Sequence, residues 1–160
     1  MNNILILDLD GVINVTIPNL KHEHVYLLDQ KQEDLFIPQL AKNINKLCKA
    51  FDFKIVISST WRKHYSIQEL EYLLRYMGIE APIIGITPVI NDKSRAFEIQ
   101  SWAKENKSMW AKYYVLDDMY TAIYDKDEHI SHKGFYLTSN EGLSNNAYKQ
   151  CLIHLKSIGY

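Results

Sequence analysis

Hydrophobic residues along the chain gather in short continuous runs rather than alternating with polar ones. Such runs are typical of strands that are buried on both faces, as in a parallel sheet covered by helices on each side. The pattern predicts strands at residues 4–7, 53–60, 81–87 and 112–118, and a short fifth strand at 134–138.

Between these runs, apolar residues recur at the spacing of one helix face. This periodicity predicts helices that begin near Pro38, after Ser66, at Asp92 and after Ser144. The helix after Ser66 opens with a capping-box pattern and is expected to end at Gly78.

The alternation of strands and helices predicts an α/β fold with a three-layer, Rossmann-like core and a mainly parallel sheet. An irregular polar stretch at residues 14–32 follows the first strand. The chain has 160 residues, the size of one domain, and its sequence contains no linker, internal repeat or low-complexity tract. We therefore expect a single domain over residues 1–160.

Composition narrows the possible partners and location. The formal net charge of −1 gives no overall basic field, so any contact with nucleic acid requires a local patch. Cys48 and Cys151 each lie on the apolar side of a predicted helix without metal-ligand spacing, which predicts buried thiols in a reducing compartment. No apolar run is long enough to span a bilayer. We expect a cytoplasmic protein with no membrane association.

Polar side chains stand at or directly after the carboxyl ends of three of the predicted strands. These residues are Asp8 and Asp10, then Ser58, Ser59 and Thr60, then Asp117 and Asp118. Because the carboxyl ends of parallel strands meet at one edge of a sheet, these side chains are expected to lie together. Carboxylates without histidine or thiolate make a site for a hard cation such as Mg²⁺.

The same cluster has the parts of a phosphoryl-transfer site that works through an aspartyl-phosphate. One carboxylate can attack phosphorus, a second can move protons, and a hydroxyl can bind phosphoryl oxygens. A cation is also needed to offset the charge of the transferred group. Lys93 and Arg95, at the start of a predicted helix, are both candidates, and the pattern does not decide between them.

The segments at these strand ends resemble a known family. "DLDGV", "VISST", the basic helix start and "VLDD" are similar, in order and placement, to the four motifs of haloacid-dehalogenase-like (HAD) phosphohydrolases, over residues 4–118. "SSTWR", "GITP", "SRAFEIQSW", "YVLDD" and "GLS" resemble the phosphatase-like domains associated with Swiss-army-knife RNA repair proteins. The resemblance implies a Mg²⁺-dependent phosphomonoester hydrolase.

The resemblance also implies roles for the acids. Asp8 would be the nucleophile, and Asp10 would first protonate the leaving oxygen and then activate water. Asp8 and Asp117 would hold Mg²⁺ through their side chains, and Asp10 through its backbone carbonyl. Asp118 would reach the metal directly or through water.

Further roles concern the phosphoryl group. Ser58 would bind its oxygens, with Ser59 as the alternative because the register at the strand end is open. Arg95 would screen its charge, with Lys93 as the alternative.

Two residues beside these motifs have weaker assignments. Arg62 is expected either to contact a substrate phosphate or to stack on Trp61 at the surface. Gly11 would allow a sharp turn where a side chain would crowd the phosphate.

The intervals between the motifs leave no room for a folded cap domain. An open site admits a phosphate on a large molecule, and the RNA-repair resemblance points to a nucleic-acid end. Tyrosines near the fourth motif could stack on bases. The alternatives are a receiver-like module that binds Mg²⁺ and phosphate without turnover, and a non-catalytic relative. Receiver domains usually have adjacent acids on the first strand, whereas here the adjacent acids Asp117 and Asp118 follow a later one.

Overall fold

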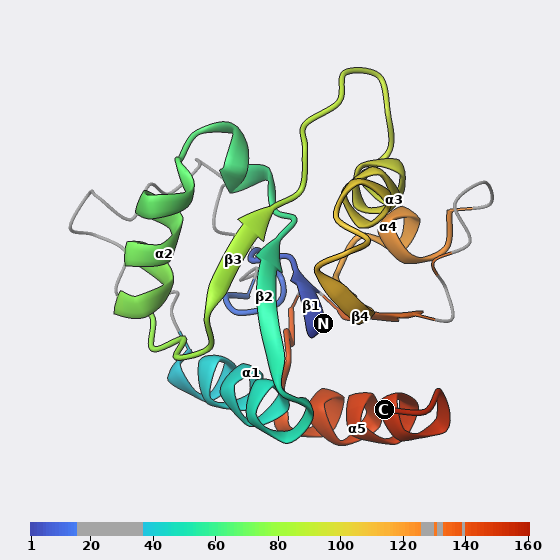
Figure 1. Cartoon of the computed structure of the whole chain (residues 1–160). Helices are drawn as coiled ribbons and strands as arrows, with labels where there is room; N and C mark the ends of the chain where they lie inside the picture. The colour runs from blue at the N-terminus through green and yellow to red at the C-terminus, as the bar shows by residue number, and fades with distance from the viewer. Residues whose placement is uncertain (16–36, 126–129, 131–132, 139) are drawn as a thin grey trace.

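The computed structural model describes residues 1–15, 37–125, 130, 133–138 and 140–160. Within these residues, five strands form one parallel sheet in the order β3-β2-β1-β4-β5 (Figure 1). The strands are β1 (Asn2–Leu7), β2 (Phe53–Ile57), β3 (Ile83–Ile86), β4 (Trp110–Asp117) and β5 (Gly134–Tyr136). The helices are α1 (Pro38–Phe51), the short 3-10 helix η2 (Thr60–Lys63), α2 (Ile67–Tyr76), α3 (Arg95–Glu105), α4 (Tyr120–Ile123) and α5 (Asn145–Ser157).

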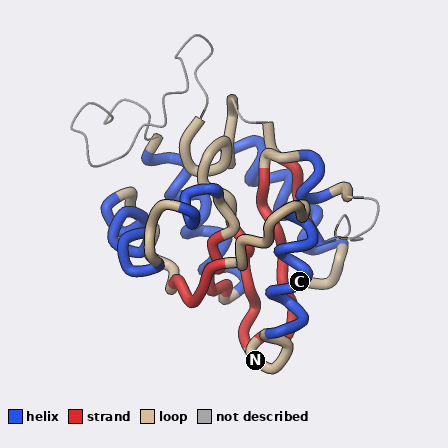
Figure 2. Tube along the Cα trace, turned by 90° about the horizontal axis from the view of Figure 1, so that it is seen from above, coloured by secondary structure: helices blue, strands red, loops and turns tan. Residues whose placement is uncertain are grey.

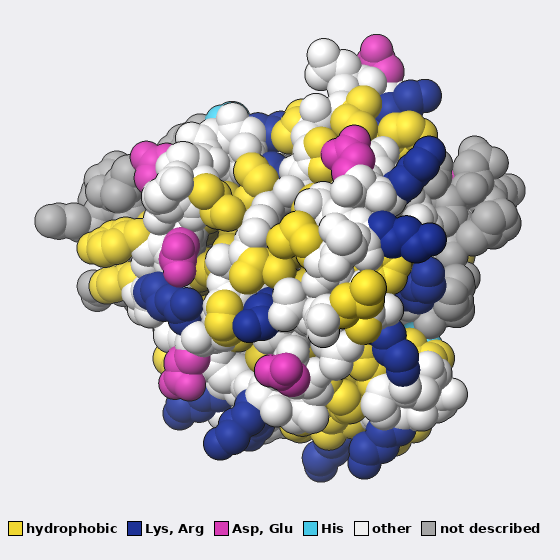
Figure 3. Space-filling model, viewed as in Figure 1, with side chains coloured by type: hydrophobic (Ala, Val, Ile, Leu, Met, Phe, Trp, Pro, Cys, Tyr) yellow, Lys and Arg dark blue, Asp and Glu magenta, His cyan; other side chains and the backbone are white. Residues whose placement is uncertain are grey.

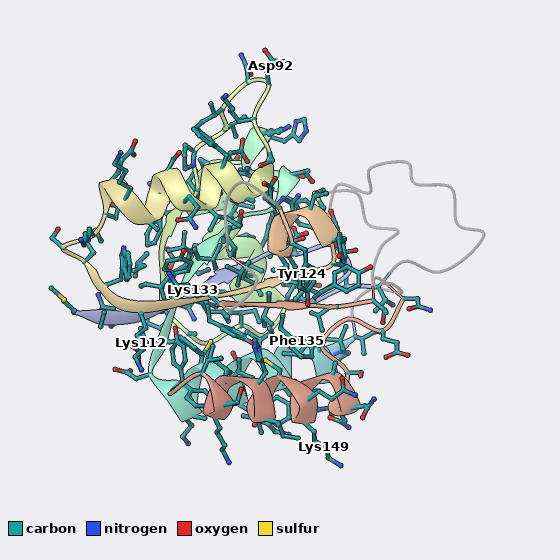
Figure 4. The ribbon with its side chains drawn as sticks, turned by 90° about the vertical axis from the view of Figure 1, so that its right-hand side faces the viewer. Asp92, Lys112, Tyr124, Lys133, Phe135 and Lys149 are labelled. Atoms are coloured by element: carbon teal, nitrogen blue, oxygen red, sulfur yellow. The ribbon has the colours of Figure 1, made fainter. Side chains whose placement is uncertain are left out.

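Helices cover both faces of the sheet, which gives the molecule three layers. In Figure 4 the sheet is seen nearly edge-on, with α3 and α4 on one side and α1 and α5 on the other. One hydrophobic core packs α1, α2 and α5 against the sheet, and a second packs α3 and α4 against its other face. In Figure 2, which looks from above, the strands lie between helices to their left and right. The expected three-layer α/β core with a parallel sheet is confirmed.

Strand β1 is buried on both faces, as its unbroken apolar run predicts. Leu5 and Leu7 belong to the core under α1, α2 and α5, whereas Ile4 and Ile6 belong to the core under α3. All four side chains are fully buried. Because successive side chains of a strand point to opposite faces, β1 is packed from both sides and fixes the place where the chain leaves the sheet.

Most helix starts follow the expected caps. Ser66 caps α2 in a capping box, and the Ser144 hydroxyl caps α5. Helix α3 begins at Arg95 rather than at the predicted Asp92, because Ser94 caps it and Asp92 has a φ of 60°. A residue in this left-handed region does not continue a right-handed helix. Helix α4 was not predicted.

No cap domain covers the core within the described residues. Between β2 and β3 the chain forms only η2 and α2, and the described chain between β3 and α3 is a loop. The expectation that the core lacks a large cap is therefore confirmed for these segments. From residue 16 onward, the irregular stretch predicted after β1 lies outside the described residues.

The strand order distinguishes this fold from that of receiver domains. Receiver domains have the doubly wound order 2-1-3-4-5, whereas the order here matches the first five strands of a Rossmann-type sheet. The topology therefore argues against the receiver-like alternative, although it does not address turnover.

Both cysteines are buried and free, as predicted. Burial raises the pKa of each thiol, Cys48 and Cys151, to about 12. Such thiols are almost wholly protonated near neutral pH, which makes them poor nucleophiles and metal ligands. Their contribution is therefore to packing.

The surface is mixed in character. On the face shown in Figure 3, Lys and Arg side chains lie mainly along the right-hand and lower edges, with acidic and hydrophobic side chains between them. None of the helices in the described part of the chain has both the length and the apolar character that a membrane span requires. The two ends of the chain lie on the same side of the molecule in Figures 1 and 2.

Candidate active site

Two buried carboxylates meet where β1 and β4 end. Asp8 directly follows β1, Asp117 is the last residue of β4, and their exposed fractions are 4% and 0%. The backbone N–H of Asp8 donates to the carbonyl of Leu116 at 3.0 Å, which continues the pairing of the two strands. Oxygens of Asp8, Asp117 and Asp118 all lie within 4.8 Å of one another. Of the four acids expected to gather at the carboxyl edge of the sheet, these three have their side chains together, and the Asp10 side chain is not part of the group.

Arg95 is the cation that faces these acids. Its Nη1 donates to Oδ2 of Asp8 at 2.5 Å and to Oδ2 of Asp117 at 2.9 Å. Arg95 is the first residue of α3, whose start is fixed by the Ser94 cap. Lys93 is exposed, and its Nζ lies 5.1 Å from the ring centre of Phe97. The structure therefore brings Arg95, and not Lys93, to the carboxylates.

The electrostatics of the cluster favour a bound cation. Burial raises the pKa of Asp8 and, together with the charge of Asp8, raises that of Asp117 to about 8. Burial and the same neighbouring charge raise the pKa of Asp118 to about 6. Burial works to lower the pKa of Arg95, but the charges of Asp8 and Asp117 outweigh it and raise that pKa. One arginine thus leaves negative charge that a metal ion would offset.

The donor set fits a metal ion of a particular kind. Three carboxylate side chains, from Asp8, Asp117 and Asp118, are close enough to share one ion. Oxygen ligands suit hard cations, which bind carboxylates in preference to softer donors. These three residues could therefore hold a metal.

The two serines after β2 occupy different environments. The Ser59 side chain interacts with the Asp8 carboxyl and works to lower its pKa. The Ser58 hydroxyl instead accepts a hydrogen bond from Thr87 Oγ1 at 3.1 Å. Both serines are buried and lie beyond the end of β2 at Ile57, which is three residues earlier than the predicted strand end. The structure therefore places Ser59, the alternative residue, next to the nucleophile candidate.

Gly11 makes room for an acid. Its φ is +71°, and a Cβ built on it would lie 2.1 Å from Oδ2 of Asp118. A larger residue would be strained by the backbone conformation and would displace that carboxylate. The sharp turn expected at Gly11 is present, and the group that a side chain would crowd is Asp118.

The Asp10 side chain is exposed but anchored. Its Oδ2 accepts a hydrogen bond from Trp61 Nε1 at 2.8 Å, and its Oδ1 accepts one from Asn14 Nδ2 at 2.9 Å. The Asn14 side chain also accepts from the backbone N–H of Gly11 at 3.1 Å. The sequence interpretation placed neither Trp61 nor Asn14 beside Asp10, and no spacing rule connects either of them to it.

Arg62 is buried, so the expectation of a surface arginine stacked on Trp61 is wrong. Its guanidinium forms an ion pair with Glu98 and donates to the carbonyl oxygens of Ser59 at 2.5 Å and Thr87 at 3.2 Å. These bonds join η2, the end of β3 and α3. A contact between Arg62 and substrate stays a prediction.

The "GLS" segment supports the loop that follows Asp8. The backbone N–H of Leu143 donates to the carbonyl of Val12 at 2.9 Å. Gly142 packs so closely that a Cβ there would lie 2.7 Å from that same carbonyl oxygen. Asn43 of α1 is fully buried and donates to the carbonyl of Leu143 at 2.9 Å. The segment therefore joins α1 and α5 to the acid-bearing loop.

Comparisons with known proteins agree with this architecture. The family model described as "HAD domain in Swiss Army Knife RNA repair proteins" matches residues 4–148. One similar solved chain belongs to "Structure of the Pnkp1/Rnl/Hen1 RNA repair complex", with a TM-score of 0.54 and 17% identity. That likeness concerns the fold and covers 85% of this chain but only 42% of the other. No curated protein matches the chain.

Proposed function

The chain belongs to the family of HAD domains in Swiss Army Knife RNA repair proteins, and on that premise we propose that it is a Mg²⁺-dependent phosphomonoester hydrolase. The reaction would proceed through an aspartyl-phosphate on Asp8. The observation that carries this proposal is the contact of Arg95 with both Asp8 and Asp117, beside Asp118. A nucleophile candidate, a cation and a metal-binding acid cluster thus lie within one site.

In the first step, a carboxylate oxygen of Asp8 attacks phosphorus and the bond from phosphorus to the leaving oxygen breaks. Asp10 gives its proton to that oxygen, so the product leaves as an alcohol. Arg95 and the Ser59 hydroxyl, both next to Asp8, donate to phosphoryl oxygens as charge develops. Ser58, which lies one residue earlier, stays the alternative donor.

In the second step, the Asp10 carboxylate takes a proton from water while the water oxygen attacks phosphorus. The bond between phosphorus and Asp8 breaks, which releases inorganic phosphate and restores the Asp8 carboxylate. Asp10 is then protonated again for the next turnover. Asp8, Asp117 and Asp118, with the backbone carbonyl of Asp10, would hold Mg²⁺, which supplies Lewis-acid stabilisation of the transferred group when bound.

We further propose that the substrate is a phosphorylated polynucleotide end. The described residues place no cap over the site. Three tyrosines near it are exposed: Tyr120 and Tyr124, which follow Asp117 and Asp118 in the chain, and Tyr136 on the neighbouring strand β5. The ring centres of Tyr120 and Tyr124 are 4.7 Å apart, and those of Tyr120 and Tyr136 are 5.8 Å apart. Figure 4 shows Tyr124 beside α4 at one end of the sheet. Exposed aromatic rings of this kind can stack on bases.

The test is phosphate release from a 3′-phosphorylated oligonucleotide, a 5′-phosphorylated oligonucleotide and p-nitrophenyl phosphate, each with Mg²⁺ and with EDTA. Metal-dependent release from one oligonucleotide end would support both parts of the proposal. Release from p-nitrophenyl phosphate alone would remove the polynucleotide substrate and keep the hydrolase. No release from any of the three would contradict the hydrolase proposal.

Mg²⁺ is expected to stabilise the folded protein. A ligand at about 100 times its dissociation constant contributes about 2.7 kcal/mol, which corresponds to roughly 8 °C in the melting temperature of a domain of this size. The physical cause is the uncompensated charge of the three clustered carboxylates. Thermal unfolding with and without MgCl₂ measures the shift.

Two Asp→Asn substitutions are compared to test the origin of this shift, one within the acid cluster and one far from it as the control. Asp118→Asn should abolish most of the Mg²⁺ effect. Asp52→Asn should retain it, because Asp52 precedes β2 at the opposite edge of the sheet and its φ of 52° is one that Asn tolerates. Equal shifts in the two variants would place the ion elsewhere.

Asp10→Asn is expected to slow phosphate release by about a hundredfold or more, because both proton transfers lose their acid and base. The steady-state rate on the best oligonucleotide substrate measures this effect. Asp52→Asn is again the matched control and should change the rate by less than about twofold. A rate for Asp10→Asn within a few-fold of wild type would exclude the acid–base role.

A further inference from the structure

The Asp10 carboxylate is held in place although it is exposed. Both of its oxygens accept hydrogen bonds from side chains, one from Trp61 Nε1 at 2.8 Å and one from Asn14 Nδ2 at 2.9 Å. An exposed aspartate has water available on all sides and needs no such partners for its solvation. The two donors therefore restrict the orientation of the carboxylate rather than compensate for burial.

Trp61 is itself fixed by its neighbours. It lies in η2, and its backbone N–H donates to the Ser59 hydroxyl at 3.5 Å. Its ring packs against Tyr65, with the ring centres 6.0 Å apart. The next residue, Arg62, ties η2 to Glu98 of α3 through a buried ion pair. The indole N–H thus projects toward Asp10 from a turn that is anchored in the protein interior.

We propose that Trp61 is a positioning residue for Asp10, an inference that rests on the proposed hydrolase function. The indole N–H fixes the carboxylate in one orientation relative to Asp8. It is a donor only, so it holds the Asp10 carboxylate through the oxygen that accepts its hydrogen bond. That carboxylate is the form that then accepts a proton from water in the second step.

The placement of Trp61 also links the two functional parts of the site. The turn that carries Trp61 directly follows Ser59, whose side chain works to lower the pKa of Asp8. The hydroxyl beside the nucleophile and the anchor of the acid are therefore two residues apart on one rigid segment. Proton transfer requires the acid to be within hydrogen-bond reach of the leaving oxygen, so a freely rotating Asp10 would spend less time in a productive position.

The test compares two substrates of similar shape that differ in their need for an acid. Phenyl phosphate has a basic leaving group that needs a proton, whereas p-nitrophenyl phosphate has a good leaving group that does not. The quantity kcat/KM reports steps up to phosphoryl transfer, which excludes the later hydrolysis of the aspartyl-phosphate. Trp61→Phe removes the N–H and keeps an aromatic ring. We expect kcat/KM to fall about tenfold for phenyl phosphate and less than about twofold for p-nitrophenyl phosphate.

Trp110→Phe is the matched control. The Nε1 of Trp110 donates to the carbonyl of Ala103 at 2.9 Å, between α3 and the start of β4, at the opposite end of the strand from Asp117. This variant loses an indole hydrogen bond of the same kind without touching Asp10. It should leave the ratio of the two kcat/KM values unchanged.

The outcomes separate the inference from the function on which it rests. Wild-type protein inactive on both aryl phosphates and on both phosphorylated oligonucleotides would overturn the proposed hydrolase, and wild type active only on the oligonucleotides would overturn the role of Trp61 if Trp61→Phe left their rate unchanged. Active wild type whose ratio changes in Asp10→Asn but not in Trp61→Phe would overturn the role of Trp61 alone. An equal loss on both substrates in Trp61→Phe would indicate general damage to the fold and would also overturn the positioning role. A selective loss on phenyl phosphate supports it.

Discussion

Asp8→Asn is expected to reduce phosphate release by about 10⁴-fold or more, because an amide oxygen cannot replace the carboxylate that attacks phosphorus. The substitution keeps the shape of the side chain, so the Leu9 N–H that donates to Oδ1 of Asp8 at 2.8 Å can keep its acceptor. Initial rates with Mg²⁺ on the same three substrates measure the loss.

The fold should survive this change. The amide oxygen of Asn can still accept from the Arg95 guanidinium, which keeps its ion pair with Asp117 at 2.9 Å. The melting temperature of Asp8→Asn should therefore not be lower than that of wild type by more than a few degrees. A variant that is folded and retains activity within tenfold of wild type would eliminate Asp8 as the nucleophile.

Arg62→Met is expected to destabilise the fold by about 3–5 kcal/mol, which is the usual cost of leaving one partner of a buried ion pair unpaired. The side chains of Arg62 and Glu98 are only 2% and 8% exposed. Without the guanidinium, Glu98 keeps the backbone N–H of Ile90 at 2.8 Å, while the carbonyls of Ser59 and Thr87 lose a donor. Urea unfolding measures the change, and the melting temperature should fall by roughly 10 °C.

A matched surface pair provides the comparison. Arg75 and Glu71 on α2 form an ion pair at 3.6 Å with side chains 40% and 47% exposed, so Arg75→Met should cost less than about 1 kcal/mol. The double variant Arg62→Met with Glu98→Gln should recover part of the loss, because no unpaired buried charge remains. Similar effects of Arg62→Met and Arg75→Met would contradict the structural role given to the buried pair.

Sequence patterns predicted the parts of the fold that depend on local physics. A continuous apolar run such as residues 4–7 has one stable place in a parallel α/β sheet, between two helical layers. The strand ends then bring Asp8 and Asp117 together, because the sheet geometry makes their positions converge. The sequence therefore predicted the three clustered side chains, Asp8, Asp117 and Asp118, but not that the Asp10 side chain lies outside the group.

The details that the sequence left open depend on the exact residue at which a strand ends or a helix begins. Ser58 and Ser59 differ by one position at the end of a strand, and such a shift sends a side chain in another direction. Lys93 and Arg95 lie on opposite sides of the Ser94 cap, so only the position of the helix start decides which of them faces the acids. Neither difference changes the hydrophobic pattern.

The contacts that sequence missed join distant segments through polar atoms. Trp61 and Asp10, or Arg62 and Glu98, have no periodic relation that a pattern could detect. The sequence left Arg62 either as a substrate contact or as a surface residue, because its buried partner Glu98 on α3 is distant in the chain. These pairings arise only once the sheet has placed η2 between the Asp8 loop and α3.

The most direct measurement is chemical trapping of the aspartyl-phosphate. The Asp10→Asn variant should accumulate the aspartyl-phosphate when p-nitrophenyl phosphate is the substrate. The intermediate still forms, because p-nitrophenolate leaves without an acid, but its hydrolysis is slow because the base that activates water is missing. Acid quenching followed by borohydride reduction converts a phosphorylated aspartate into homoserine, and peptide mass spectrometry locates it. The proposed mechanism predicts homoserine at position 8, dependent on both substrate and Mg²⁺. Homoserine at another aspartate, or none while p-nitrophenol is released, would contradict it.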